Sequence, residues 1–387
     1  MKNKVTVAGY LCLDIMPRIC AAPDGEAFSF VPGKLQEIKG TDMACGGAVA
    51  NTGLALHILG KQVLMAARLG DDIVGMTIRG IIDQYAPALT AGIINDENAS
   101  SGCTVVLNPP QQDRMFLVNT GANRLFTPED VSDAMLSQSA LLHFGYPPLM
   151  ENFYRHNGEA ALRLFRRAHA AGAMVSLDMS LPDSASDSAR VDWEKWLTAV
   201  LPEVDVFLPS LEEIRFMLQG SFTGDHAAAG ALDANELHRL SERLLQMGVP
   251  VVVIKLGSKG IYVRTAADPA MFGRIAATVR SEHLSSWYDR ELLSPCLEAE
   301  VRGTTGAGDC TIAGFLTGLL EGMSAPATAT LACAVGACNV EQPDAVSGLI
   351  SLDATRRRLS AGWCACDAYV NKNDWLQLPE GVYERRG

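Results

Sequence analysis

Between residues 141 and 257 the chain alternates short apolar runs with longer amphipathic stretches. The apolar runs are LLHFG, MVSLD, DVFLP and VVVIKLG. Between them, apolar residues recur at helical spacing, which predicts helices over 152–171, 193–200, 211–218 and 234–247. Strands that alternate with helices form βαβ units with parallel strands. The pattern therefore predicts an α/β fold in which a doubly wound, mostly parallel sheet is flanked by helices.

The N-terminal part of the chain continues this alternation and adds β-rich segments. It predicts strands over 5–8 and 63–66 and helices over 48–59 and 75–84. Two further runs, 103–107 and 115–118, are joined by a polar turn that contains Pro109 and Pro110. We expect these two runs to form part of a small sheet that covers a substrate. The irregular segment 18–44 is expected to hold a hairpin off the main sheet.

The C-terminal part predicts two more helices, over 325–340 and 353–361, and then an aromatic tail. The tail over 363–387 carries Trp363, Tyr369, Trp375 and Tyr383. We expect a packed extension of the domain, and its placement at a subunit contact stays open.

A glycine-rich loop, GTTGAGD at 303–309, precedes a predicted helix whose apolar residues include Ile312 and Phe315. Glycines leave room for backbone amides to close around an anion, and the helix N-terminus adds a positive partial charge. Asp309 places a carboxylate beside that site. The arrangement suits phosphoryl transfer, in which amides hold developing charge and a carboxylate takes a proton from the attacking hydroxyl. The alternative is a common glycine turn, in which Asp309 only favours the helix N-terminus.

Charge and cysteine content exclude several classes of function. The net charge is -12 and the pI is about 5.1, unlike a nucleic-acid-binding surface. No stretch approaches the roughly 18 uninterrupted apolar residues of a membrane span, and the N-terminus lacks the apolar core of a signal peptide. The 10 cysteines are scattered, without a CxxC pair or zinc-site spacing. We therefore expect a cytoplasmic protein with reduced thiols and no nucleic-acid or membrane partner.

A set of ordered motifs resembles the ribokinase-like (PfkB) carbohydrate kinase family. The loop at 303–309 resembles the family's second signature, usually written DTTGAGD. The other matches are VAGYLCLD at 7–14, GGAVANTGLALHILG at 46–60, RLGDDIVG at 68–75, GAN at 121–123, VDVFLPSLEE at 204–213 and IKLGSKG at 254–260. Ordered matches at suitable spacing are far more specific than any one of them, so the chain is identified as a member of the family.

The resemblance implies a ribokinase-like kinase domain over 1–362, with lid inserts at about 9–45 and 95–120, and a C-terminal extension over 363–387. It implies transfer of a phosphoryl group from ATP to a primary hydroxyl of a sugar or sugar acid. ATP and Mg²⁺ are the implied cofactors, and a homodimer through the lid is one implied arrangement.

The resemblance also implies roles for individual residues. Asp309 is the expected proton acceptor, and the amides of Gly306, Ala307 and Gly308 are the expected cradle for the transferred group. The expected acceptor-binding residues are Asp14, Gly46, Gly47 and Asn51. Glu213 is expected to reach Mg²⁺ through water. The expected nucleotide-binding residues are Ser210, Glu213, Lys255, Gly257, Gly260, Thr304, Ala334 and Asn339.

Two positions depart from the family's motifs. Gly303 stands where DTTGAGD has its first Asp, which helps to hold a monovalent cation in several members, so we expect little activation by potassium. Ser210 replaces the Asn of the usual PNxxE motif, although Glu213 is retained. Taken without the family, Glu213 is typical of an exposed helix carboxylate, Asn51 of a helix cap or buried polar residue, and Asp14 of a turn or cap.

Three other functions stay open or are disfavoured. A nucleoside kinase of the same family would need an apolar lid with stacking aromatics, and Phe28, Phe30 and Phe116 are available. A weakly catalytic, sugar-binding regulatory protein is suggested by Gly303 and Ser210. A Rossmann dehydrogenase is disfavoured because no GxGxxG motif follows the first strand, and the turn at 257–260 is not a Walker loop.

Overall fold

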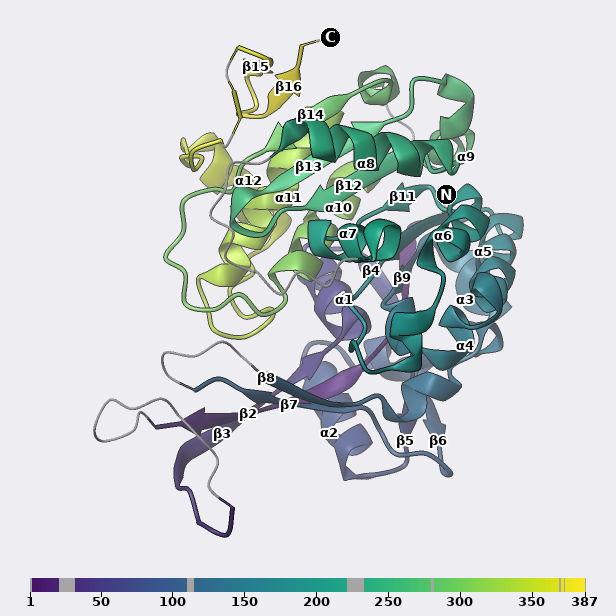
Figure 1. The fold of residues 1–387 in the computed structure, drawn as a ribbon, viewed down its shortest axis with the longest axis vertical. Helices are drawn as coiled ribbons and strands as arrows, with labels where there is room; N and C mark the ends of the chain where they lie inside the picture. The colour runs from purple at the N-terminus through teal and green to yellow at the C-terminus, as the bar shows by residue number, and fades with distance from the viewer. Residues whose placement is uncertain are drawn as a thin grey trace.

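The computed structural model describes residues 2–20, 32–109, 115–220, 233–279, 282–368, 370–371 and 373–386. Helices cover both faces of a 10-stranded sheet (Figure 1). Its strands are β1 (Lys4–Gly9), β4 (Gln62–Ala66), β9 (Ser139–Gly145), β10 (Met174–Asp178), β11 (Val206–Phe207), β12 (Val251–Lys255), β13 (Ile261–Thr265), β14 (Glu291–Ser294), β15 (Trp375–Gln377) and β16 (Tyr383–Arg385). Their order is β15-β16-β14-β13-β12-β11-β10-β9-β1-β4.

The sheet has a parallel part and an antiparallel part. From β12 through β11, β10, β9 and β1 to β4, every neighbouring pair is parallel. Strand β9 is buried along its whole length, as expected for a strand with helices on both faces. Strands β13, β14, β16 and β15 complete the sheet with antiparallel pairs. The predicted doubly wound, mostly parallel α/β fold is confirmed.

Two sets of helices bury the two faces of this sheet. The helices are α1 (Ala48–Ile58), α2 (Ile73–Asp83), α3 (Asp133–Gln138), α4 (Glu151–Tyr154), α5 (Glu159–Ala170), α6 (Trp193–Val200), α7 (Leu211–Gln219), α8 (Ala234–Gln246), α9 (Gly273–Thr278), α10 (Ala307–Leu320), α11 (Ala325–Val340) and α12 (Leu352–Ser360). Because successive strand residues point to opposite faces, Val251 and Val253 join one hydrophobic cluster and Val252 and Ile254 join the other. The first cluster includes α1, α10 and α11, and the second includes α5 to α8.

Small residues bring α10 and α11 close together. A Cβ atom at Gly314 of α10 would lie only 2.9 Å from Ala332 Cα of α11. Helix α10 also contacts α1. This tight packing fixes the direction of α10, whose N-terminus carries the glycine-rich loop.

A second, 4-stranded sheet projects from the helical layers at the lower left of Figure 1. It has the order β3-β2-β7-β8 and is built from β2 (Cys12–Ile19), β3 (Ile38–Gly46), β7 (Cys103–Leu107) and β8 (Met115–Asn119). Strand β2 pairs parallel with β7, which joins the two distant segments of the chain. Two further short strands, β5 (Arg68–Gly70) and β6 (Ile94–Asp96), pair beside it. We refer to the 4-stranded unit as the small sheet.

Some predicted elements match and others are wrong. The predicted elements 103–107, 174–178, 193–200 and 325–340 coincide with β7, β10, α6 and α11. A single helix over 152–171 is wrong, because Asn157 (φ 50°) and Gly158 (φ 79°) adopt left-handed conformations that separate α4 from α5. Of the residues singled out above, Phe28, Phe30, Pro110 and Tyr369 lie outside the described residues. No helix in the described ranges is both long and apolar enough to span a bilayer.

Candidate active site

The glycine-rich loop ends at the N-terminus of α10. Gly306 is the N-cap and has a φ of 72°, a conformation that favours glycine. A Cβ atom at Gly306 would lie 2.7 Å from Ala345 Cβ, so the backbone of the loop packs against residue 345 at a distance that excludes a side chain. The first amides of a helix lack partners within the helix and carry positive partial charge. The loop therefore presents a helix end whose positive partial charge favours an anion.

Asp309 lies in the first turn of α10 and is only 5% exposed. Asn51 Nδ2 donates a hydrogen bond of 3.0 Å to Asp309 Oδ2, and Thr52 Oγ1 donates one of 3.3 Å to Oδ1. The Tyr146 hydroxyl lies 3.0 Å from both carboxylate oxygens. Burial raises the pKa of Asp309, although these donors and the charge of Lys255 act in the opposite direction. A carboxylate of raised pKa is a better proton acceptor.

The predicted acceptor-binding residues meet beside Asp309. Position 46 requires glycine, because the Asp14 side chain packs against it and a Cβ atom there would lie 2.3 Å from Asp14 Oδ2. Asn51 of α1 links this group to Asp309, 258 residues away in sequence. Among the described residues, Asn51 Oδ1 is buried and has no hydrogen-bond partner. Burial is the main cause that raises the pKa of Asp14 to about 6, and the charge of Asp309 adds to it.

A buried ion pair lies where β10 and β12 end. Lys255 Nζ donates a hydrogen bond of 2.5 Å to Asp178 Oδ1, and the Asp178 side chain is 1% exposed. A Cβ atom at Gly308 would lie 3.6 Å from Lys255 Cδ, so the lysine crosses the first turn of α10. Burial lowers the pKa of Lys255, but the charges of Asp178 and Glu213 raise it overall. The lysine therefore stays charged beside the N-terminus of α10.

Ser210 and Glu213 form a capping box at the start of α7. The Ser210 amide donates a hydrogen bond of 2.6 Å to Glu213 Oε2, and the Glu213 amide donates one of 3.2 Å to Ser210 Oγ. The box accounts for one carboxylate oxygen of Glu213 and does not use the other. Glu213 is 9% exposed, whereas the neighbouring Glu212 lines the cavity described next.

A cavity of about 500 Å³ lies at the N-terminus of α10, and we name it the α10 cavity. Its walls include Ile261, Leu297 and Val340. Of the predicted nucleotide-binding and anion-binding residues, those that line it are Ser210, Lys255, Gly257, Gly260, Thr304, Ala307 and Gly308.

Ala334 and Asn339 of α11 are not among the residues that line the α10 cavity. Ala334 is fully buried in a hydrophobic cluster with Leu297 and Ala337. Asn339 is buried on another side of the helix, where its Nδ2 donates a hydrogen bond of 2.5 Å to Ala345 O. Cys333, Gly336, Ala337 and Val340 are the α11 residues near them that line the cavity.

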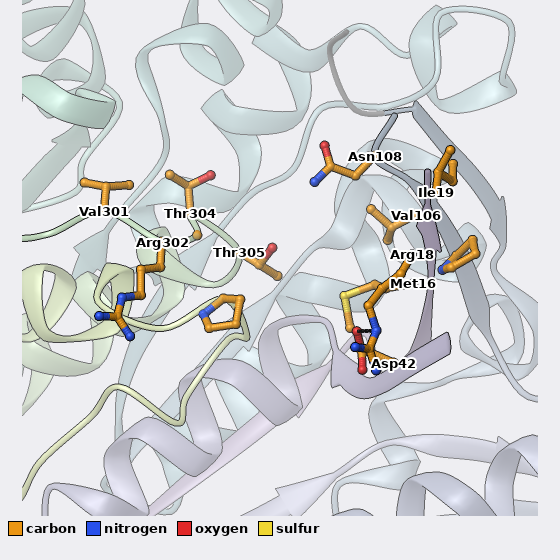
Figure 2. Close-up of a pocket in the computed structure, with 13 residues that line it drawn as sticks. Met16, Arg18, Ile19, Asp42, Val106, Asn108, Val301, Arg302, Thr304 and Thr305 are labelled. Atoms are coloured by element: carbon orange, nitrogen blue, oxygen red, sulfur yellow. Dashed lines mark ion pairs between the residues drawn. The ribbon is translucent and has the colours of Figure 1, made fainter. Parts of the chain in front are cut away.

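A second cavity, of about 480 Å³, separates the small sheet from the glycine-rich loop, and we name it the small-sheet cavity. Figure 2 shows Met16, Arg18 and Asn108 of the small sheet and its border on one side and Thr304 and Thr305 on the other. The Arg18 guanidinium pairs with Asp42 at 3.0 Å. Val301 and Thr304 line both cavities, so the loop stands between them.

Sequence reasoning missed Tyr146 and Thr52, which both contact Asp309. Tyr146 directly follows β9 and has a φ of 67°, a left-handed conformation that is uncommon for a bulky residue. Its position immediately after a buried strand was a signal, because ligands bind beyond the C-terminal ends of parallel strands. Thr52 directly follows Asn51 in α1, and nothing in its spacing alone distinguished it.

Comparison with known proteins identifies the family. Residues 10–351 match the model of the pfkB family of carbohydrate kinases. An uncharacterised sugar kinase from Archaeoglobus fulgidus is 24% identical over 296 residues, which covers 76% of this chain and 98% of that protein. Fructokinase-2 from Solanum habrochaites is 23% identical over 363 residues, with 92% and 95% covered.

Solved structures show the same fold. Arabidopsis thaliana ribokinase, complexed with ribose and ATP, aligns with a TM-score of 0.69 and 18% identity, covering 92% of this chain and 98% of that one. The nucleoside kinase of Methanocaldococcus jannaschii aligns with a TM-score of 0.64 and 17% identity, covering 93% and 99%. Because the family match extends over most of the sequence, the chain belongs to the pfkB family of carbohydrate kinases.

Proposed function

We propose that this protein transfers the terminal phosphoryl group of ATP to a primary hydroxyl of a sugar or sugar acid. The observation that carries the proposal is the buried Asp309 carboxylate, held beside the anion-binding end of α10. Asn51 connects it to the acceptor-binding group, and Lys255 connects it to the α10 cavity. A proton acceptor between an acceptor-binding group and a phosphate-binding helix end is what an in-line transfer from one ligand to another requires.

The α10 cavity is the proposed ATP site. Its apolar walls suit a planar base, and the amides of Gly306, Ala307 and Gly308 suit the phosphates. Lys255 adds a charged donor next to these amides. The transferred group develops charge on its oxygens, and preorganised donors stabilise that charge.

Mg²⁺ is the proposed metal cofactor, and it neutralises charge on the phosphates when bound. No group of three or more His, Cys, Asp or Glu side chains in the described ranges could hold a metal ion alone. This fits Mg²⁺, which kinases hold with one or two carboxylates together with the substrate phosphates. Glu213 would take part through a water molecule, using the oxygen that the capping box leaves over.

The acceptor is proposed to bind between the small sheet and α1. Asp14 and the unpartnered Asn51 Oδ1 would accept hydrogen bonds from its hydroxyl groups. Asp309 would then take the proton of the attacking hydroxyl. None of the described residues that line the small-sheet cavity is aromatic, but Asp14, Gly46, Gly47 and Asn51 do not line it either, so its lining leaves the choice between a sugar and a nucleoside to experiment. Phe116 is 56% exposed on β8 and does not line this cavity.

A screen for ADP release tests the proposal. Purified protein with ATP and Mg²⁺ would be offered pentoses, hexoses, sugar acids and nucleosides. We expect acceptor-dependent ADP release with at least one sugar or sugar acid. Release with nucleosides alone would support the nucleoside kinase. Sugar binding measured by calorimetry, without release of ADP, would support a weakly catalytic, sugar-binding regulatory protein.

The raised pKa of Asp14 predicts a pH dependence of acceptor binding. Its carboxyl is ionised above a pKa of about 6 and protonated below it. Protonation removes acceptor capacity, so we expect the KM for the acceptor to rise as the pH falls below that value. Measuring KM between pH 5 and pH 8, roughly the range that brackets this pKa, checks it. In the Asp14→Asn control, KM should be high at every pH, and a flat profile for the unmodified protein would contradict the assignment.

Gly303 predicts weak dependence on monovalent cations. A hard anionic ligand is absent at this position. A Cβ atom there would lie 2.7 Å from both Cα and O of Pro343, so Gly303→Asp should not create a site without moving the backbone. We expect K⁺ to stimulate turnover little more than tetramethylammonium at equal ionic strength, in both proteins. Strong, saturable activation of the unmodified protein by K⁺ would show that this prediction is wrong.

A cytoplasmic location and a homodimer through the small sheet complete the proposal. Strand β8 lies at the edge of that sheet, and Phe116, Leu117 and Val118 are all more than half exposed. An exposed apolar edge strand is typical of an interface.

A further inference from the structure

We propose that the C-terminal extension, beyond residue 362, forms one wall of the nucleotide site. The family match ends at residue 351, so the extension lies outside it. Cys366 of the extension lines the α10 cavity together with Cys296 and Cys333. The ligand is a nucleoside triphosphate or diphosphate, and the inference rests on the proposed function of this cavity.

Residues 363–366 run antiparallel to the segment that follows β14. The Glu298 amide donates a hydrogen bond of 3.0 Å to Cys364 O, and the Cys366 amide donates one of 2.8 Å to Cys296 O. Leu297 and Ala365 form the bridge between these bonds. Cys366 is therefore held opposite Cys296 by the backbone, in a fixed position on the cavity wall.

Trp363 anchors the start of this segment. Its Nε1 donates a hydrogen bond of 2.7 Å to Glu298 O, and the Arg358 guanidinium stacks on its ring at 3.5 Å from the centroid. Arg358 also forms a two-pronged ion pair with Glu341, at 2.8 and 2.5 Å. Glu341 directly follows Val340, which lines the same cavity, so the anchor and the cavity share the end of α11.

The two short strands β15 and β16 anchor the far end of the extension. Strand β16 pairs with β14 and adds the extension to one edge of the main sheet. Trp375 is 2% exposed, and Arg385 forms an ion pair of 3.0 Å with Glu291. With both ends fixed, the segment that carries Cys366 does not depend on the ligand for its position.

The three thiols make the wall apolar at neutral pH. Burial raises the pKa of Cys296 to about 11 and that of Cys333 to about 12, and it also raises the pKa of Cys366. Protonated cysteines behave as small hydrophobic residues. Such a wall suits the base of a nucleotide, whose phosphates would lie at the amides of α10.

Protection from alkylation tests the inference on the unmodified protein. A limiting amount of N-ethylmaleimide would be added with and without saturating ADP, with saturation established by calorimetry, and labelling followed by mass spectrometry. We expect ADP to slow labelling of Cys366 at least about tenfold and to leave Cys364 unaffected. Cys364 is the matched control, since it is exposed on the same segment and does not line the cavity. Equal labelling of Cys366 with and without bound ADP would overturn the inference.

A pair of substitutions gives a second test. Cys366→Trp places a large side chain in the wall, whereas Cys364→Trp places the same side chain outside it. We expect at least about tenfold weaker ADP binding in the first variant and unchanged binding in the second, with similar melting temperatures. If Cys366→Trp binds ADP normally, the inference is wrong and the proposed function survives. If the unmodified protein binds neither ADP nor ATP, both are wrong.

Discussion

Replacing Asp309 by Asn should lower kcat by roughly 10²-fold or more, the scale of a general base. The amide keeps the size of the side chain, and it can still accept hydrogen bonds from Asn51 and Tyr146. It cannot take the proton of the attacking hydroxyl. Because that interaction exists only in the transition state, the KM for the acceptor should change little. Steady-state kinetics with the acceptor identified by the screen would measure both constants.

The competing explanation for Asp309 is that it only stabilises the helix N-terminus, an effect of about 0.3–1 kcal/mol. Asp353 offers a matched control, since it lies in the first turn of α12 and is exposed. Asp353→Asn should reproduce such a stability effect and leave kcat unchanged. If Asp309→Asn is slightly destabilised but nearly fully active, like the control, Asp309 is not the proton acceptor.

Replacing Lys255 by Met should have the second largest effect, on both stability and turnover. The substitution leaves the Asp178 carboxylate buried and unpaired, which costs about 3–5 kcal/mol in comparable buried pairs. It also removes the charged donor beside Gly308 at the proposed phosphate site. We expect a lower melting temperature and a large loss of kcat/KM for ATP.

A double variant separates these two effects. Lys255→Met combined with Asp178→Asn removes both charges of the pair, so stability should recover towards that of the unmodified protein. Turnover should not recover, because the phosphate site still lacks its cation. Melting temperature and kcat/KM for ATP would be measured on the same preparations. Recovery of both would mean that the pair serves the fold alone.

The parts of the fold that follow from local composition were predictable from the sequence. Helix α11 and strand β10 have the predicted bounds, because α11 is a long run of mostly small residues and β10 is a short apolar run. The break between α4 and α5 was not anticipated, since Asn157 and Gly158 interrupt a pattern that otherwise continues through them. The antiparallel strands at the end of the sheet were also missed. Strands β14, β15 and β16 have only 4, 3 and 3 residues, and β16 depends on pairing with β14, which no local pattern encodes.

Site residues that belong to a sequence motif were predictable, whereas residues that reach the site only through tertiary contacts were harder to predict. The motifs pointed to Asp309 and Asn51, and the structure places Asn51 Nδ2 3.0 Å from Asp309 Oδ2. Tyr146 had no motif and reaches Asp309 through an unusual backbone conformation. Asn339 was predicted only from the region of the helix in which it lies. Such a prediction is imprecise, because a change of one position along a helix turns a side chain by about 100°. The capping box of Ser210 and Glu213 was not predicted, although S-x-x-E is the sequence pattern that such boxes show.

The most direct test of the account is to identify the product of the reaction. The protein, ATP, Mg²⁺ and the acceptor from the screen would be followed by ³¹P and ¹³C nuclear magnetic resonance. We predict ADP and a phosphate monoester in equal amounts, with the phosphorus coupled to the carbon of a primary hydroxyl. The same reaction with Asp309→Asn should form this ester far more slowly. Formation of ADP and inorganic phosphate alone, whether or not an acceptor is present, would contradict the proposed transfer.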